Sequence, residues 1–153
     1  MMGVGSGLQN LGTSNPELSS VTSLPSDYAE LEHSTLHTGQ WDWHSYIQRG
    51  SRSSTFRDLC PSTAKFIDSL GPKLFTTPFS YAFFSTLHPG AKITPHSSSM
   101  NLRLRLHLPL IVPQSKEHGI ACGASTRTWE EGKCVVLDDS YVHHVYNDTP
   151  EPR

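Results

Sequence analysis

The stretch from His96 to His107, which reads HSSSMNLRLRLH, constrains the fold of this chain more than any other part. From residue 102 onward, leucine occupies every second position, and polar side chains stand between the leucines. Successive side chains of a β-strand point to opposite faces, so this alternation predicts a strand over residues 101–112 with its leucines in the core. The polar parity then lines a second surface, and solvent is the ordinary occupant of such a surface. The two sets are Leu102, Leu104, Leu106, Leu108 and Leu110, and Asn101, Arg103, Arg105 and His107.

Short extended segments separated by turn residues surround this stretch. The segment FSYAFFSTLHPG (79–90) and the segment KITPH (92–96) precede it, and segments around 120–122, 134–139 and 141–146 follow it. Five or six short strands at this spacing predict a mainly β fold, either a sandwich or a barrel of jelly-roll type. One short helix is expected over 61–70, with Pro61 in its first turn and Gly71 at its exit.

The N-terminal part of the chain differs in composition from the rest. Residues 1–35 are rich in Gly, Ser, Thr, Asn and Pro without a sustained period, which predicts a flexible leader containing at most a short helix over 26–33. The aromatic segment 39–50 is expected to be the first packed part of a domain over 36–153. A cluster of aromatic residues is more often core than ligand platform.

Charge and hydropathy argue against two classes of partner. The chain has 153 residues and a net charge of −2, so no basic excess favours nucleic acid. It contains no apolar run long enough to cross a bilayer and no signal-peptide pattern, so a cytoplasmic protein is the default expectation. Three cysteines without framework spacing fit a reducing compartment.

Two of the nine histidines stand out as candidate metal ligands. His96 and His143 each adjoin a strand signature, and the 47 residues between them (143 − 96) allow antiparallel strands to return the chain to the same place. Spacing alone is a weak signal. Other histidines, including His44 and His118, lie in polar or loop contexts where a solvated or hydrogen-bonded side chain is the simpler interpretation.

The ordered motifs make the pattern specific. They are N-x-R-x-R-x-H at 101–107, W-x-x-G-K at 129–133 and DDS-x-x-H at 138–143. From Trp41 to the C-terminus the sequence resembles the aspartyl/asparaginyl β-hydroxylases, a family of Fe(II)- and 2-oxoglutarate-dependent dioxygenases.

The resemblance implies a double-stranded β-helix that binds iron through His96 and His143. Related oxygenases add a carboxylate two residues after the first histidine, whereas this chain has Ser98, which we do not count as a ligand. Asp138 or Asp139 could replace the missing ligand. The more ordinary role for either is to accept hydrogen bonds and orient an imidazole.

The resemblance also assigns the residues that bind 2-oxoglutarate. Arg153 matches the arginine that binds the distal carboxylate, assisted by the Ser85 hydroxyl. Arg105 and His107 match residues that contact the carboxylate next to the keto group. For Arg103, a side chain that simply faces solvent is as good an interpretation as a role in the site. Family members continue through another core strand after this arginine, so the last core strand is expected to be missing here.

The main hypothesis is therefore a dioxygenase that uses Fe(II), 2-oxoglutarate and O2 to hydroxylate a C–H bond, releasing succinate and CO2. Family precedent suggests Asp or Asn side chains of a protein substrate, and a small-molecule substrate stays open. The alternative is a non-catalytic jelly-roll binding module that has lost turnover. A nucleic-acid-binding face built on RLRLH lacks support from charge or an aromatic platform.

Overall fold

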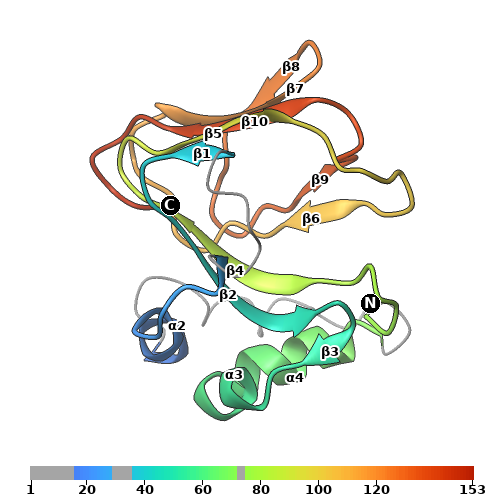
Figure 1. The fold of residues 1–153 in the computed structure, drawn as a ribbon. Coiled ribbons are helices and arrows are strands. Elements are labelled where there is room, and N and C mark those ends of the chain that lie inside the picture. Colours follow the sequence, from blue (N-terminus) through green and yellow to red (C-terminus); the bar gives the residue numbers. More distant parts are fainter. Residues whose placement is uncertain (1–15, 29–35, 72–74) are drawn as a thin grey trace, which may run out of the picture. The chain divides into compact units, whose positions relative to one another are not determined.

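The computed structural model describes residues 16–28, 36–71 and 75–153 (Figure 1). The chain divides into a first unit, residues 1–31 and 42–85, and a second unit, residues 32–41 and 86–153. Short helices and antiparallel strands make up the first unit, and the described residues of the second unit form antiparallel strands without a helix, which confirms the expected mainly β class. The helices are α2 (Pro16–Thr22), α3 (Ser54–Leu59) and α4 (Pro61–Ser69). The strands are β1 (His37–Thr38), β2 (Trp41–Gln48), β3 (Ser51–Arg52), β4 (Ala82–Leu87), β5 (Lys92–His96), β6 (Arg105–His107), β7 (His118–Cys122), β8 (Ser125–Arg127), β9 (Val135–Leu137) and β10 (His143–Asn147).

The helices of the first unit begin where the sequence supplies suitable residues. The Ser53 side chain caps α3 by accepting a hydrogen bond from the Phe56 amide at 3.1 Å. Pro61 opens α4, which confirms the helix expected over 61–70. The residue before it offers no side-chain cap, and the Glu17 carboxylate from α2 accepts hydrogen bonds from the amides of Ser62 and Thr63 instead.

The core of the first unit is apolar and aromatic. Tyr46 and Ile47 of β2 are fully buried, and the ring of Phe56 lies 5.3 Å from Tyr46 and 5.4 Å from Phe84. The aromatic segment around Trp41 is thus a packed strand, as its composition predicts. The buried cluster consists of Val21, Tyr46, Ile47, Phe56, Cys60 and Ala64.

Part of the segment expected to be a flexible leader has a defined structure. Residues Pro16–Thr22 form helix α2, and Val21 is only 1% exposed within the core cluster. Residues 1–15 and 29–35 of the expected leader lie outside the described residues, as does most of the helix expected over 26–33. None of the helices in the described ranges combines the length and hydropathy needed to cross a lipid bilayer.

A five-stranded antiparallel sheet in the order β1-β5-β10-β7-β8 dominates the second unit, and β6 and β9 form a separate two-stranded ribbon (Figure 1). Segments 92–96, 120–122, 134–139 and 141–146 all contain strands, as expected. Gly119 allows close packing in this sheet, because a Cβ there would lie 3.0 Å from the Arg127 carbonyl oxygen of β8.

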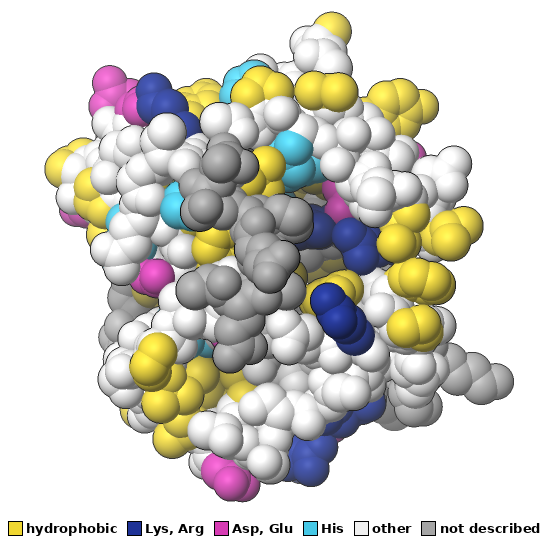
Figure 2. Space-filling view, viewed as in Figure 1, with side chains coloured by type: hydrophobic (Ala, Val, Ile, Leu, Met, Phe, Trp, Pro, Cys, Tyr) yellow, Lys and Arg dark blue, Asp and Glu magenta, His cyan; other side chains and the backbone are white. Residues whose placement is uncertain are grey.

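The prediction of a long strand over 101–112 is wrong, both in the length of the strand and in the side to which its leucines point. Only Arg105–His107 form a strand, and Leu102, Leu104 and Leu106 are 72%, 67% and 60% exposed. Figure 2 shows hydrophobic side chains at the surface on the side where β6 lies in Figure 1. Alternation shows that two faces of a strand differ, but it does not show which face is interior. Here the polar parity faces inward, because Arg105 pairs with the buried Asp139.

Candidate functional site

A bulge in β5 places the two candidate histidines opposite each other. His143 on β10 pairs with His96 on β5, and Val145 pairs with Ile93, so three steps along β5 match two along β10. The extra residue lies around Pro95, which has no amide hydrogen to give to the ladder. The two rings lie on the same face of the sheet with centroids 4.2 Å apart and planes inclined by 55°. Two histidines that lie far apart in the sequence are therefore in contact in the structure.

Each of these histidines is oriented by the backbone carbonyl of the residue two positions before it. Nδ1 of His96 lies 2.8 Å from the Thr94 carbonyl oxygen, and Nδ1 of His143 lies 2.8 Å from that of Tyr141. A carbonyl oxygen only accepts, so Nδ1 carries the proton in both rings. In the neutral rings the lone pair is then on Nε2, which is the arrangement that metal-binding histidines adopt.

Asp139 holds the arginines of the inward face. Its carboxylate is 2% exposed, and Oδ2 accepts hydrogen bonds from Nε and Nη2 of Arg105 at 3.1 and 2.9 Å, while Arg103 approaches to 3.6 Å. Arg103 also donates to the Ser98 hydroxyl at 3.4 Å, so solvent exposure is not its main environment. Asp139 thus orients a guanidinium rather than an imidazole, and Asp138 accepts from Ser140 at 2.6 Å.

The Trp129 ring contacts three other side chains of the second unit. Its ring is 3% exposed and stacks with His107 and His118 at centroid distances of 6.2 and 5.9 Å, with interplanar angles of 19° and 26°. The Arg153 guanidinium lies 3.7 Å from the same ring. The backbone of Arg153 is fixed by two hydrogen bonds to Leu87, at 2.8 and 3.0 Å. Flat guanidinium groups stack on aromatic faces and keep their edges available for planar anions.

Burial decides the charge states in this group. Desolvation, with the nearby charges of Arg105 and Arg153, lowers the pKa of His107 to about 4. Desolvation also lowers the pKa of His96. It lowers the pKa of Arg153 to about 10, which leaves the guanidinium charged at neutral pH. The site therefore combines neutral imidazoles with cationic guanidiniums.

Several buried polar atoms of this group have no hydrogen-bond partner among the described residues. Nε of Arg153 and Oδ1 of Asp139 are two of them, together with Nδ1 of His118 and Nε1 of Trp129. Buried polar groups are normally satisfied, and exceptions cluster where a ligand or ordered water completes the network. Nε of Arg153 is therefore a hydrogen-bond donor that lacks an acceptor among the described residues.

The structure brings together five of the six residues selected from the sequence, all in the second unit: His96, His143, Arg105, His107 and Arg153. Ser85 is exposed on β4 and belongs to the first unit. In the described ranges, no cluster of three His, Cys, Asp or Glu side chains could hold a metal ion. Among the described residues, the two histidines would therefore offer a metal ion two nitrogen ligands and no protein carboxylate.

Sequence reasoning missed two members of this group. The sequence predicts a polar or loop context for His118, but this side chain is 2% exposed and stacks on Trp129. Trp129 itself was part of the W-x-x-G-K motif without an assigned role. Its position in that motif was the available signal. His44, likewise expected in a polar context, is 5% exposed in the first unit.

Comparison with known proteins agrees with the motifs. A family model described as aspartyl/asparaginyl beta-hydroxylase matches residues 10–153. Human aspartyl/asparaginyl beta-hydroxylase is 34% identical over 110 residues, covering 72% of this chain and 14% of the human protein. Mouse aspartate beta-hydroxylase domain-containing protein 2 is 31% identical over 111 residues, covering 72% and 32%. The domain-containing protein 1 of mouse is 30% identical over 145 residues, covering 94% and 38%. The chain thus spans well under half the length of these relatives.

Proposed function

Because the chain belongs to the aspartyl/asparaginyl β-hydroxylase family, we propose that it hydroxylates Asp or Asn side chains of a protein substrate, using Fe(II), 2-oxoglutarate and O2. The names of its relatives support hydroxylation in general. The cofactors, the coproducts succinate and CO2, and the substrate residue are the part that we propose.

The observation that carries this proposal is the matched pair of histidines. His96 and His143 face each other across two strands, and both Nδ1 atoms are committed to carbonyl oxygens. Both Nε2 lone pairs thus remain for a metal, and burial favours the neutral form of His96. When bound, iron would supply the activation of O2. Water and 2-oxoglutarate would fill the positions that the two histidines leave open.

The stacked guanidinium supports a site for the dianionic cosubstrate. Arg153 is charged, rests on Trp129 and has a buried Nε without a partner among the described residues. A planar fork of this kind binds carboxylates through two parallel hydrogen bonds. His107, neutral at physiological pH, can donate one hydrogen bond to a second carboxylate. Arg105 would bind the same carboxylate through the N–H groups of its guanidinium that do not contact Asp139.

The arrangement of strands is consistent with the double-stranded β-helix that we propose as the fold. The five-stranded sheet and the β6–β9 ribbon of the second unit both contribute side chains to the same cavity, so the two layers face each other. The candidate site lies on that inner side.

The test is turnover of 2-oxoglutarate by the whole chain with Fe(II), followed as succinate by NMR and as oxygen gain in Asp- or Asn-containing peptides by mass spectrometry. Wild type should produce succinate, and His143→Ala should not. His144→Ala is the matched control, because His144 is exposed and points to the opposite face of β10. Equal turnover by wild type and His143→Ala would contradict the proposal. Folded protein without any thermal shift on addition of Fe(II) or 2-oxoglutarate would favour a binding module.

A further inference from the structure

One rung of the five-stranded sheet extends past the histidine pair toward the edge of the sheet. His143 on β10 pairs with His96 on one side and with Cys122 of β7 on the other. Cys122 in turn pairs with Ser125 of β8. Directly opposed residues of antiparallel strands point to the same face. The face that presents the histidines therefore continues over Cys122 and Ser125.

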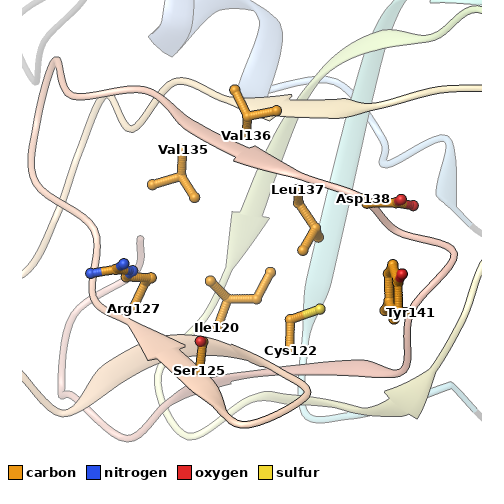
Figure 3. Close-up of a pocket in the computed structure, with 9 residues that line it drawn as sticks. All are labelled: Ile120, Cys122, Ser125, Arg127, Val135, Val136, Leu137, Asp138 and Tyr141. Carbon is orange, nitrogen blue, oxygen red and sulfur yellow. The ribbon is translucent and has the colours of Figure 1, made fainter.

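A cavity of about 320 Å³ lies on this continuation of the face (Figure 3). In Figure 3, Ile120 and Cys122 of β7 point toward Val135 and Leu137 of β9, whereas Val136 points away. The space between the strands is thus lined mainly by apolar side chains. Its volume lies within the range of about 300–1,000 Å³ that is typical of ligand pockets.

The two ends of this cavity carry different charges. Arg127 lies at one end, and Asp138 and Tyr141 lie at the other (Figure 3). Oδ1 of Asp138 accepts hydrogen bonds from the Ser140 amide and hydroxyl at 3.1 and 2.6 Å, and the carboxylate keeps its negative charge because both donors are neutral. Arg127 is exposed and forms no salt bridge with any other described residue. The rim is therefore positive at the Arg127 end and negative at the Asp138 end, so an acidic group is expected at Arg127.

We propose that this cavity is a subsite for an apolar side chain of the polypeptide substrate, and that Arg127 receives an acidic group of the same segment. The inference rests on the proposed function, because it takes the residue at the histidine pair to be part of a polypeptide. Consecutive Cα atoms are about 3.8 Å apart, and neighbouring strands are about 4.8 Å apart. A residue held at His143 thus places one of its near neighbours over Cys122 and Ser125.

The test uses direct binding of fluorescein-labelled, alanine-rich peptides with one central aspartate, measured by fluorescence anisotropy with the whole chain. A phenylalanine is moved through the flanking positions one at a time. Burial of an aromatic side chain should tighten binding by about tenfold or more at one or two positions only. The absence of any positional preference in wild type would overturn the proposal.

Two neighbouring residues of β8 provide a matched pair of variants. Ser125→Trp fills the cavity from its rim, whereas Thr126→Trp adds the same side chain to the opposite face of the strand. Ser125→Trp should abolish the preference for phenylalanine, and Thr126→Trp should retain it. Equal loss in both variants would overturn the proposal.

The charge at the rim is tested with glutamate-containing members of the same peptide series. Arg127→Gln should weaken their binding several-fold, and neutral peptides should bind as before. Lys133→Gln is the control, because Lys133 is an exposed cation outside the cavity. Equal effects of the two variants would remove Arg127 from the subsite. Peptides that bind with positional preference but gain no oxygen would contradict the hydroxylase function and leave the subsite intact.

Discussion

The interiors of the two units differ in chemistry. The first unit buries Tyr46, Ile47 and Phe56 in contact with one another, and its core is a set of packed rings and aliphatic groups. The second unit buries a carboxylate and several imidazoles, and some of their polar atoms lack partners among the described residues. Burial of apolar surface favours folding, whereas burial of unsatisfied polar groups disfavours it. Buried polar atoms without a partner among the described residues occur in both units, such as Nδ1 of His44 in the first and Nε of Arg153 in the second. What distinguishes the second interior is that a carboxylate, guanidiniums and imidazoles gather there. This difference in composition indicates that the first interior serves mainly stability and that the second is arranged for a ligand.

The largest expected effect is the loss of a ring from the first interior. Phe56 is 3% exposed and contacts the rings of Tyr46 and Phe84. Phe56→Ala should therefore lower the free energy of unfolding by about 3–5 kcal/mol, through lost burial and the cavity that remains. Urea denaturation followed by circular dichroism measures this value. A change below about 1 kcal/mol would mean that this cluster is not the stabilising core.

The central carboxylate of the second interior should have the next largest effect. Asp139→Asn removes the charge that balances Arg105 and approaches Arg103. Loss of one partner of a buried ion pair costs about 3–5 kcal/mol, and we expect about 2–3 kcal/mol because Arg105 keeps 32% of its side-chain surface exposed. Asp138→Asn is the control, since Asp138 accepts hydrogen bonds only from Ser140. Equal destabilisation by the two variants would show that the Arg105 pairing is not what matters.

The pH dependence of stability should separate the two interiors further. The folded-state pKa of His107 is about 4, below the usual value near 6.5, so the unfolded chain binds the proton first. Stability from this residue is present above about pH 6.5 and is lost as the pH falls toward 4. His107→Gln should therefore show a shallower decline in urea midpoint between pH 7 and pH 4.5 than wild type. Parallel declines would indicate that His107 is not buried in its neutral form.

The smallest effect is expected where the sequence alone predicted a large one. Leu104 is 67% exposed, so Leu104→Ser should change the free energy of unfolding by less than about 0.5 kcal/mol. Thermal denaturation provides the measurement. A loss of unfolding free energy comparable to that of Phe56→Ala would show that the alternating leucines are buried in a core.

The sequence was sufficient to predict several strands and the approach of two distant histidines, because strand patterns and ordered motifs are local signals. Segment 92–96 is a strand as expected, and strand context together with the family resemblance selected His96 and His143, which the structure places in contact. Which side of the 101–112 segment faces the interior was not predictable, because an alternating pattern does not distinguish the two sides of a strand. Helix α2 was missed because its stability comes from distant partners, such as the contacts of Glu17 with α4.

The role of Asp139 could not be predicted for a similar reason. An acidic residue four positions before His143 looks like a partner for that imidazole. The imidazole is instead oriented by the Tyr141 carbonyl oxygen, and Arg105 from another strand occupies the carboxylate. Which donor reaches a buried carboxylate depends on tertiary packing, and one sequence does not contain that information.

The most direct measurement of the proposed ligand site is calorimetric titration of the whole chain with 2-oxoglutarate, with Mn(II) in place of Fe(II) to prevent turnover. Wild type should bind one equivalent, and Arg153→Gln should bind at least about tenfold more weakly, because the charged fork over Trp129 is lost. Arg153→Gln retains the backbone atoms that bond to Leu87, so the chain should stay folded. Absence of binding by wild type, or equal binding by both proteins, would contradict a second unit built around a metal and a dicarboxylate.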